Sequence, residues 1–192
     1  MRILEERILK DGEVYPGEVL RVGSFLNQQL DTELITLMGK EIADHFRDKG
    51  VTKILTIETS GIALAFATAQ ALGVPMVFAK KHKSNNLDQV LVSTKVFSYT
   101  HQSTYDVVVS REFIDSSDNI LIVDDFLAKG NAIIGLLEII ETAGAECAGA
   151  AVAIEKGFQH GGDKIRDMGI DLLSLAIIES MSDDSLTFRH QD

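Results

Sequence analysis

Alternation of strand-type and helix-type segments constrains the fold of this chain more than any other feature of its sequence. Short apolar runs typical of buried strands alternate with segments whose apolar residues repeat at helical spacing. Parallel neighbouring strands need crossover connections, which helices usually supply. The pattern therefore predicts an α/β fold with a central, mostly parallel sheet flanked by helices. Strands are expected at residues 53–57, 75–79, 119–123, 148–154 and 171–178, and helices at 62–71, 131–143 and 163–168.

A further helix is expected between Asp31 and Gly50, where local signals set both of its ends. Asp31 is a favourable N-cap residue, and Gly50 is a favourable C-terminal stop. The apolar residues between them repeat at the spacing of one helical face. The expected buried stripe consists of Leu34, Leu37, Met38, Ile42 and Phe46.

Two segments depart from the strand and helix alternation. At the amino end, a helix within residues 1–10 precedes two short alternating stretches in residues 12–22, which favour a small hairpin or an extended arm. Later, residues 90–99 and 105–110 are rich in β-forming side chains, which predicts an antiparallel excursion or a flap. No repeat or Pro-, Gly- or Ser-rich linker divides the sequence, so residues 1–192 are expected to form one domain.

The charge of the chain argues against nucleic acid as its main partner. Its 18 basic and 29 acidic residues give a formal net charge of −11, the wrong sign for binding a phosphate backbone. No apolar run approaches the roughly 18 residues of a membrane span, so we expect no membrane partner and a cytoplasmic location. The single cysteine, Cys147, lies in an apolar run and is expected to be a small buried hydrophobe.

The segment from Ile120 to Ala132 carries the clearest chemical signal. An apolar strand ends in the paired acids Asp124 and Asp125, followed by a short loop with Gly130 and then a helix. Loop amides and a helix amino terminus favour a phosphate, whereas the two acids suit ribose hydroxyls, a magnesium ion or a developing positive charge. On the residues alone, the acids could instead merely end a strand, with Asn131 capping a helix.

The stretch from Val123 to Ala132 resembles the phosphoribosyl diphosphate signature of the type I phosphoribosyltransferases, which is quite specific. The resemblance implies the type I phosphoribosyltransferase fold, with an amino-terminal hood over the base, formed by about residues 1–30, and a flexible flap. Asp124 and Asp125 would be the catalytic acids that hold the ribose hydroxyls of 5-phosphoribosyl 1-diphosphate. The loop that would bind its 5-phosphate consists of Ala128, Lys129, Gly130, Asn131 and Ala132.

One residue departs from the hypoxanthine-guanine branch of this family. Those enzymes carry an acid, proposed as the base toward the purine, where this chain has Ala128. The adenine enzymes resemble this chain at that position. The resemblance therefore leaves the general acid or base unidentified and excludes placing it in the loop.

Two further segments gain meaning from the resemblance. The segment after the strand at 53–57 corresponds to the diphosphate-binding loop of the family and consists of Thr59, Ser60 and Gly61, with Glu58 in a helper role. Without the resemblance, this segment would be read only as a helix cap. The basic cluster from Ala79 to Ser84 would be a solvated turn by position alone, but in the family it supplies positive charge to the diphosphate, with Lys81 as the leading candidate. Residues 83–102 would be the mobile catalytic flap.

The base would be recognised from two sides. A lysine after the corresponding strand contacts the exocyclic oxygen of a 6-oxopurine in purine enzymes of the family, and Lys156 matches it. The hood would place Leu20 and Asn27 against the purine and stack Phe25 nearby. On the residues alone, Phe25 and Leu26 would be core residues and Asn27 part of a turn. Over nearly its whole length, the chain resembles the branch of the family that uses dioxopurines such as xanthine. The segments that carry this resemblance are the amino-terminal arm, residues 58–61, the basic cluster and Glu155–Lys156.

The resemblance also implies partners. Magnesium is expected with the diphosphate, although the sequence shows no separate metal cage. A homodimer is expected because a basic residue from this region reaches the neighbouring site in related dimeric enzymes. A non-catalytic regulator on the same fold is the alternative, but regulators of that kind usually need a nucleic-acid surface or an added domain.

Overall fold

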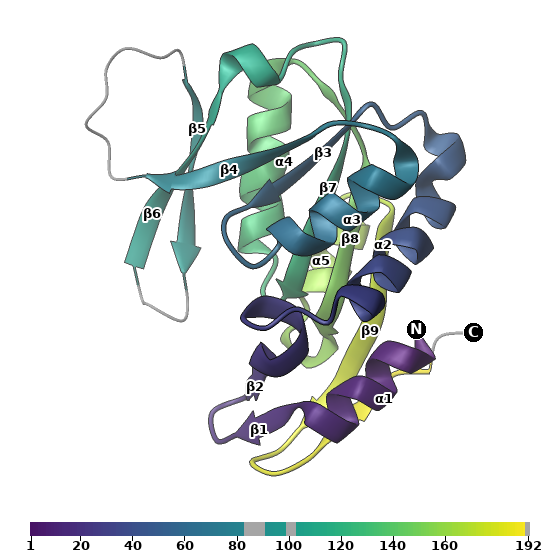
Figure 1. The fold of residues 1–192 in the computed structure, drawn as a ribbon. Coiled ribbons are helices and arrows are strands. Elements are labelled where there is room, and N and C mark those ends of the chain that lie inside the picture. Colours follow the sequence, from purple (N-terminus) through teal and green to yellow (C-terminus); the bar gives the residue numbers. More distant parts are fainter. Residues whose placement is uncertain (83–90, 99–102, 191–192) are drawn as a thin grey trace.

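An eight-stranded mixed sheet organises the molecule (Figure 1), whose computed structural model describes residues 1–82, 91–98 and 103–190. Neighbouring strands from β9 to β4 are parallel, while β10, β6 and β5 run antiparallel to their partners. The predicted α/β fold with a mostly parallel sheet is thereby confirmed. In spatial order the strands are β10 (Leu186–Phe188), β9 (Leu172–Met181), β8 (Glu146–Lys156), β7 (Asn119–Leu127), β3 (Lys53–Ile57), β4 (Met76–His82), β6 (Ser103–Ser110) and β5 (Leu91–Ser98).

Helices cover both faces of the sheet, and the alternation of side chains along the strands builds a core on each side. On β7, Leu121 and Val123 pack with the core under α1 to α3, whereas Ile120 and Ile122 pack with the core under α4 and α5. All four side chains are fully buried. The helices are α1 (Arg2–Asp11), α2 (Thr32–Phe46), α3 (Ile62–Leu72), α4 (Asn131–Ala143) and α5 (Gly161–Asp167).

The buried face of α2 differs from the predicted stripe at one position. Leu37 is 39% exposed, so its placement in the stripe was wrong, and Ile35 is buried instead. The helix turns its face toward α3, where Gly39 fits closely: an added Cβ would lie 2.6 Å from the carbonyl carbon of Ala67. Leu37 lies on the opposite side of this contact, beyond the reach of the core.

Several strands extend further than their apolar runs predicted. β7 continues from Val123 to Leu127, because β8 pairs with it along that length, so the acids lie inside the strand and not after it. β4 continues to His82, because β6 pairs with Lys80 to His82, so this part of the basic cluster is strand and not a turn. β10 was not predicted, and it pairs with the end of β9.

The amino-terminal segment forms a hood at the lower end of the view in Figure 1. It contains α1, the hairpin of β1 (Glu13–Tyr15) and β2 (Val19–Arg21), and an unpredicted π-helical turn, Gly23–Asn27. Phe25 and Leu26 in that turn are buried in the main core. Phe25 therefore cannot stack on a base as the resemblance implied, because its ring has no exposed face.

The expected excursion after β4 is confirmed as antiparallel where the structure describes it. β6 pairs with both β4 and β5, which joins the excursion to the main sheet. Residues 83–90 and 99–102 of the expected flap lie outside the described residues. Within the described part of the chain, no helix is both long and apolar enough to cross a lipid bilayer.

Asp31 caps α2 as predicted, and it also ties the helix to the hood. Its carboxylate accepts hydrogen bonds from Leu34 N (3.1 Å) and Arg7 Nη1 (2.6 Å). The Leu34 amide first, and the Arg7 guanidinium in addition, hold the pKa of Asp31 below its ordinary value of 3.8. A carboxyl group whose pKa is lowered by folding stabilises the fold above its ordinary pKa, and that contribution is lost as the pH falls through the lowered value.

Asp31→Ala should therefore lower the thermal midpoint at neutral pH. The difference from the parent should be smaller at about pH 3, below the ordinary pKa of 3.8, because the carboxyl group of the unfolded chain is protonated there before that of the folded chain. Thermal unfolding followed by circular dichroism at both pH values checks this. Asp44→Ala, which removes an exposed ion pair with Arg47 on the same helix, serves as the control and should have little effect. A difference between Asp31→Ala and parent that does not change with pH would contradict the prediction.

Candidate functional site

Four consecutive strands of the sheet bring the predicted site residues to one edge. In the order β8, β7, β3 and β4, their carboxyl ends carry Lys156, the pair Asp124 and Asp125, the loop from Thr59 to Gly61, and Lys81. Ligands of open α/β sheets bind in the crevice beyond these strand ends. The hood lies beyond the same edge (Figure 1). The sheet order alone therefore unites segments that are far apart in the sequence.

Asp124 and Asp125 are buried on β7, each only 8% exposed. The backbone amide of Asp125 donates to Asp124 Oδ1 at 2.9 Å. Burial, and then the neighbouring Asp125 charge, raise the pKa of Asp124 well above its ordinary value. The pair therefore retains a proton more readily than two separate surface carboxylates would.

The loop after β3 approaches Asp124 so closely that only glycine fits at position 61. An added Cβ on Gly61 would lie 2.3 Å from Thr56 Oγ1 and 2.6 Å from Asp124 Oδ1. The loop leads directly into α3 and leaves Thr59 exposed. The loop thus joins the end of β3 to the start of α3 beside the buried acid.

Lys81 reaches this group of residues from β4. Its backbone amide donates to Glu58 Oε1 at 2.8 Å, which assigns Glu58 the role of joining the end of β3 to β4. The Lys81 ammonium lies 5.3 Å from the centre of the Tyr105 ring. Burial first, and the Asp124 charge second, raise the pKa of Tyr105. Lys81, Tyr105 and Asp124 therefore share one electrostatic environment.

The loop from Ala128 to Ala132 adopts the predicted turn into α4. Gly130 has a φ of +85°, a conformation that glycine adopts without penalty, and its carbonyl accepts from Ile134 N in the first turn of the helix. The dipole of a helix favours an anion at its amino terminus, which here is the start of α4. The segment therefore has the order of strand, glycine turn and helix start that the sequence predicted.

At the end of β8, Lys156 contacts the hood. Its Nζ donates to the backbone oxygen of Glu18 at 2.6 Å, and Gln159 Nε2 donates to the carboxylate of the same residue at 2.7 Å. Burial lowers the pKa of Lys156. An ammonium has three protons, so the bond to Glu18 leaves further donor capacity for a ligand.

The two predicted hood residues line one hollow, and Asn27 also reaches the acids. Asn27 Nδ2 is 3.4 Å from Asp125 Oδ2, a long hydrogen bond between the hood and β7. Leu20 and Asn27 both line a hollow of about 740 Å³ formed by hood residues. Leu20 is itself mostly buried, so it can offer only a small apolar surface.

Magnesium fits this site only as a companion of a bound phosphate compound. The described residues include no group of three His, Cys, Asp or Glu side chains that could hold a metal ion. Magnesium usually keeps several water ligands and binds through one or two carboxylates together with substrate phosphates. Asp124 and Asp125 can supply such carboxylate contacts, whereas a cage made of protein alone is not formed by the described residues.

Sequence reasoning missed five residues that the structure brings to this edge. Glu18, Tyr105 and Gln159 carry no local signal, because their roles depend on pairing between distant segments. The consecutive glycines Gly161 and Gly162, which open α5, do carry one. Two glycines at a helix start indicate a close approach of other atoms.

Comparison with known proteins shows similarity along almost the whole chain. A family model described as phosphoribosyl transferase domain matches residues 24–180. The chain is 51% identical over 191 residues to a protein named xanthine phosphoribosyltransferase from Lachnoclostridium phytofermentans, covering 98% of each. It is 47% identical over 192 residues to a protein of the same name from Bacillus cereus, covering 100% of this chain and 98% of the relative.

Solved structures support the fold. Adenine phosphoribosyltransferase from Giardia lamblia, complexed with 9-deazaadenine, matches with a TM-score of 0.74 at 23% identity, covering 92% of this chain and 98% of that one. The enzyme of the same name from Trypanosoma brucei, in complex with AMP, pyrophosphate and ribose-5-phosphate, matches with a TM-score of 0.76 at 18% identity. The second match covers 94% of this chain and 81% of that chain. At these identities the likeness establishes the fold alone.

Replacing Asp124 with Asn should stabilise the ligand-free protein at neutral pH. A carboxyl group whose pKa is raised by folding destabilises the fold once it is ionised, so the parent loses this stability as the pH rises from near the ordinary value of 3.8 through the raised pKa. We expect the thermal midpoint of Asp124→Asn at pH 7 to rise by about 2–4 °C, the shift that roughly 1 kcal/mol gives in a chain of this size. Scanning calorimetry at about pH 4 and pH 7 measures the difference, which should be smaller at the lower pH. If Asp124→Asn were less stable than the parent at pH 7, the conclusion that the folded protein raises the pKa of Asp124 would be contradicted.

Proposed function

Because the chain belongs to the phosphoribosyltransferase family, we propose that it transfers the 5-phosphoribosyl group of 5-phosphoribosyl 1-diphosphate to xanthine, giving xanthosine 5′-monophosphate and diphosphate. The proposal rests on sequence identity: about half of all residues, over nearly the full length, are identical to those of proteins named for this reaction. The arrangement of acids, phosphate loop and lysine along four adjacent strand ends supports it.

The phosphoribosyl donor would lie along the β7, β3 and β4 ends. Asp124 and Asp125 face the ribose hydroxyls, and residues 128–132 wrap the 5-phosphate with backbone amides. Thr59, Ser60 and Gly61 receive the diphosphate, with Lys81 adding positive charge. Gly61 lets the diphosphate loop and the ribose acids stay in contact, because any larger residue would separate them.

The reaction replaces one bond at the ribose C1 by another. The bond to the diphosphate oxygen breaks, diphosphate leaves with the electron pair, and a ring nitrogen of xanthine bonds to C1 and loses its proton. Positive charge develops on the ribose, where the buried Asp124 and Asp125 stabilise it in a region of low dielectric. Magnesium bound with the diphosphate would neutralise part of its negative charge. Ala128 offers no proton acceptor, so the phosphate loop contributes positioning and not a base.

Recognition of xanthine would come from Lys156 and the hood. The Lys156 ammonium donates only, which favours a 6-oxo group over the 6-amino group of adenine. Asn27 both donates and accepts, as the remaining polar edge of a dioxopurine requires. Asn27 lies within 3.4 Å of Asp125, so the base and ribose regions are adjacent.

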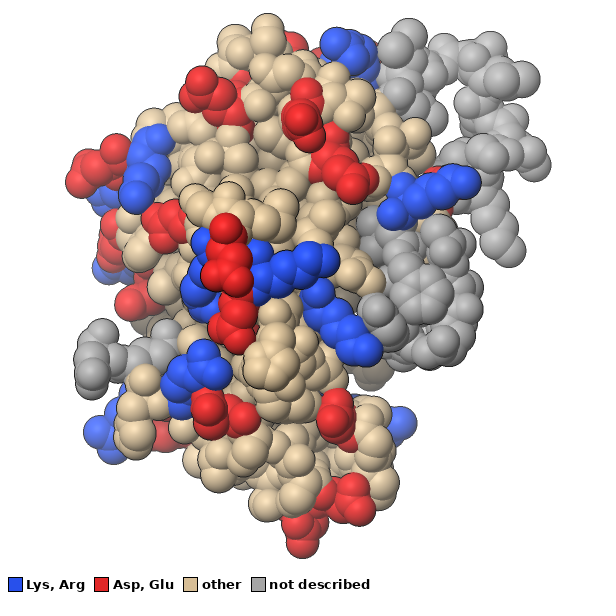
Figure 2. Space-filling model, turned by 180° about the vertical axis from the view of Figure 1, so that it is seen from behind, with Lys and Arg blue, Asp and Glu red and all other residues tan. Residues whose placement is uncertain are grey.

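The regulator alternative lacks support from the surface. On the face that Figure 2 draws, basic side chains gather near the middle but adjoin acidic ones, and further acidic side chains lie around them, in line with the net charge of −11. A protein that reads DNA normally gathers its basic residues into a continuous patch. We therefore propose an enzyme of the cytoplasm and no nucleic-acid-binding role.

A homodimer is part of the proposal, and an apolar groove beside the diphosphate loop supports it. The groove has a volume of about 530 Å³ and runs between α2 and α3, where Thr59 and Ser60 line one end. Phe66 is 59% exposed and Leu30 is 45% exposed along it. Exposed apolar surface of this kind usually marks an interface, and a second copy seated here would lie next to the diphosphate site.

The function is tested by offering xanthine, guanine, hypoxanthine and adenine separately with 5-phosphoribosyl 1-diphosphate and magnesium, and identifying the nucleotide formed. Xanthine should give the highest kcat/KM, and adenine should be a poor substrate. A preference for adenine would overturn the base assignment, and failure to form any nucleotide would overturn the function.

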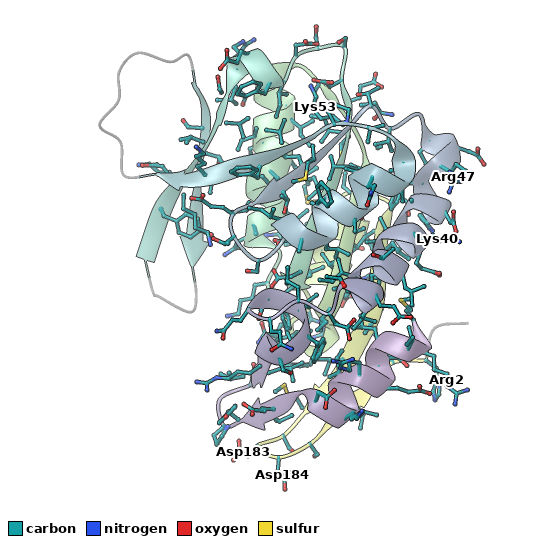
Figure 3. All side chains as sticks on the ribbon, viewed as in Figure 1. Arg2, Lys40, Arg47, Lys53, Asp183 and Asp184 are labelled. Carbon is teal, nitrogen blue, oxygen red and sulfur yellow. The ribbon has the colours of Figure 1, made fainter. Side chains whose placement is uncertain are left out.

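Lys156→Ala should lower kcat/KM for xanthine by about ten- to a hundredfold, because removal of a charged donor from a mostly desolvated site costs roughly 1.5–3 kcal/mol. Binding of 5-phosphoribosyl 1-diphosphate, measured by calorimetry, should change far less. Lys40→Ala, on the outer surface of α2 (Figure 3), is the control for loss of a lysine and should match the parent. If Lys156→Ala had the same kcat/KM for xanthine as the parent, Lys156 would not be a base-binding residue.

Phe66→Glu should dissociate the proposed dimer, because a buried carboxylate without a partner is strongly unfavourable at an interface. Light scattering after size-exclusion chromatography measures the mass. Phe113→Glu is the matched control, since Phe113 is similarly exposed (53%) but lies in a 3-10 turn, Arg111–Phe113, outside the groove. A dimer that survives Phe66→Glu would show that the interface lies elsewhere.

A further inference from the structure

An ion pair between the buried Glu155 and the partly exposed Arg166 is not used by the proposed chemistry. Glu155 is fully buried although it lies next to the end of β8. Arg166 of α5 donates to both of its carboxylate oxygens, at 3.1 and 2.8 Å, and Ser174 Oγ of β9 donates to Oε2 at 2.5 Å. The carboxylate of Glu155 on β8 is therefore held by two other elements, α5 and β9, and accepts the two parallel bonds that fix a guanidinium in one orientation.

Two consecutive glycines connect this pair to the loop of residues 128–132. An added Cβ on Gly162 would lie 2.0 Å from Glu155 Oε1. An added Cβ on Gly161 would lie 2.1 Å from the carbonyl oxygen of Ala128 and 2.7 Å from Gly130 N. Neither glycine has a positive φ, so both are needed for space and not for backbone conformation. The start of α5 is thus in contact with the carboxylate on one side and with the loop backbone on the other.

The contact under the loop is extensive enough to determine where the loop lies. Gly130 faces Gly161 O, at 3.3 Å from an added Cβ, and the buried Ile165 packs below it, with Cδ1 at 3.6 Å from the same point. A loop held only by its own turn could shift relative to the sheet. One that rests on a helix whose position is fixed by a bidentate ion pair cannot shift without moving that helix.

The same carboxylate also adjoins the base side of the site. Glu155 precedes Lys156, and β8 pairs with β9 at both residues. The backbone that carries the lysine is thus fixed by the side chain of its neighbour. Stability alone does not require an ion pair here, because apolar residues of similar size often stabilise as well or better.

We propose that Glu155 and Arg166 form a positioning pair that holds the 5-phosphate loop, through Gly161, and Lys156 at the separation the two substrates need. The inference rests on the proposed function. Neither residue touches a substrate; the pair acts through α5 and the end of β8. Displacement of the loop weakens binding of the phosphoribosyl donor, because backbone amides bind phosphate only in close and well-aligned contact.

Glu155→Gln keeps the shape of the side chain but cannot accept both guanidinium bonds in the same way. We expect it to raise the KM for 5-phosphoribosyl 1-diphosphate at least about fivefold and the KM for xanthine by a smaller factor, with kcat at saturation within about threefold. The dissociation constant of the donor, measured by calorimetry, should rise in parallel with its KM.

Gly161→Ala tests the contact without altering the ion pair. Its methyl group must displace the loop backbone, so the KM for the donor should rise by about fivefold or more while the KM for xanthine stays within about twofold. If Glu155→Gln does not fold, Gly161→Ala still tests whether the contact between α5 and the loop determines donor binding. An unchanged donor KM in Gly161→Ala would overturn the proposed coupling between α5 and the loop.

Asp118→Asn is the matched control. It weakens another short, poorly exposed ion pair, which lies at the amino ends of β3 and β7, away from the proposed site at their carboxyl ends. Lys53 Nζ lies 2.6 Å from Asp118 Oδ2, and Lys53 lies at the end of the molecule remote from the hood (Figure 3). This variant should lower the thermal midpoint and leave both KM values within about twofold of the parent.

The two proposals can fail separately. If Glu155→Gln loses stability as Asp118→Asn does but keeps the parent's KM values and donor affinity, the pair is structural only and the positioning role is wrong. If the parent itself binds no 5-phosphoribosyl 1-diphosphate, the proposed function is wrong.

Discussion

The central position of β7 is the constraint on which the rest of the structure depends. This strand is hydrogen-bonded to β3 on one side and β8 on the other, and its side chains supply both cores. A strand in that position has no freedom to slide, because a shift of one residue would exchange its two faces. The acids near its end therefore occupy defined positions. Their burial, and the raised pKa of Asp124 that follows from it, is a direct result of strand pairing that continues past them.

Local sequence signals predicted the elements well where one segment alone decides the structure. Asp31 caps its helix, Gly130 turns the loop into α4, and the apolar run before Asp124 is a strand. The family resemblance implied that Asp124, Thr59 and Lys156 serve one site. The order of the strands that brings them to one edge was not predicted, since the pattern of elements by itself does not specify which strands are neighbours.

What the sequence could not predict depends on partners distant along the chain. Strand β7 runs beyond Val123 because β8 continues beside it, and Lys81 is in a strand because β6 pairs there. Phe25 is buried because the π-helical turn directs it into the main core; its apolar side chain alone indicated this, and only the family resemblance implied contact with the base. In the sequence, Glu155 looks like an ordinary carboxylate near a strand end. Its role depends on Arg166 of α5 and Ser174 of β9, which bind it only in the folded protein. In each case the deciding contact crosses elements.

The buried Phe25 has a consequence for how base preference can change. A hood that merely covered the site could be exchanged between relatives as an independent segment, together with its specificity. Here the segment that carries Leu20 and Asn27 also supplies Leu20, Val22, Phe25 and Leu26 to the core shared with α2 and α3. A graft that altered base preference would have to preserve that packing, since core side chains tolerate changes of volume poorly. Diversification of substrate choice in this architecture is therefore expected to proceed by single replacements at exposed hood positions such as Asn27, and not by exchange of whole hoods.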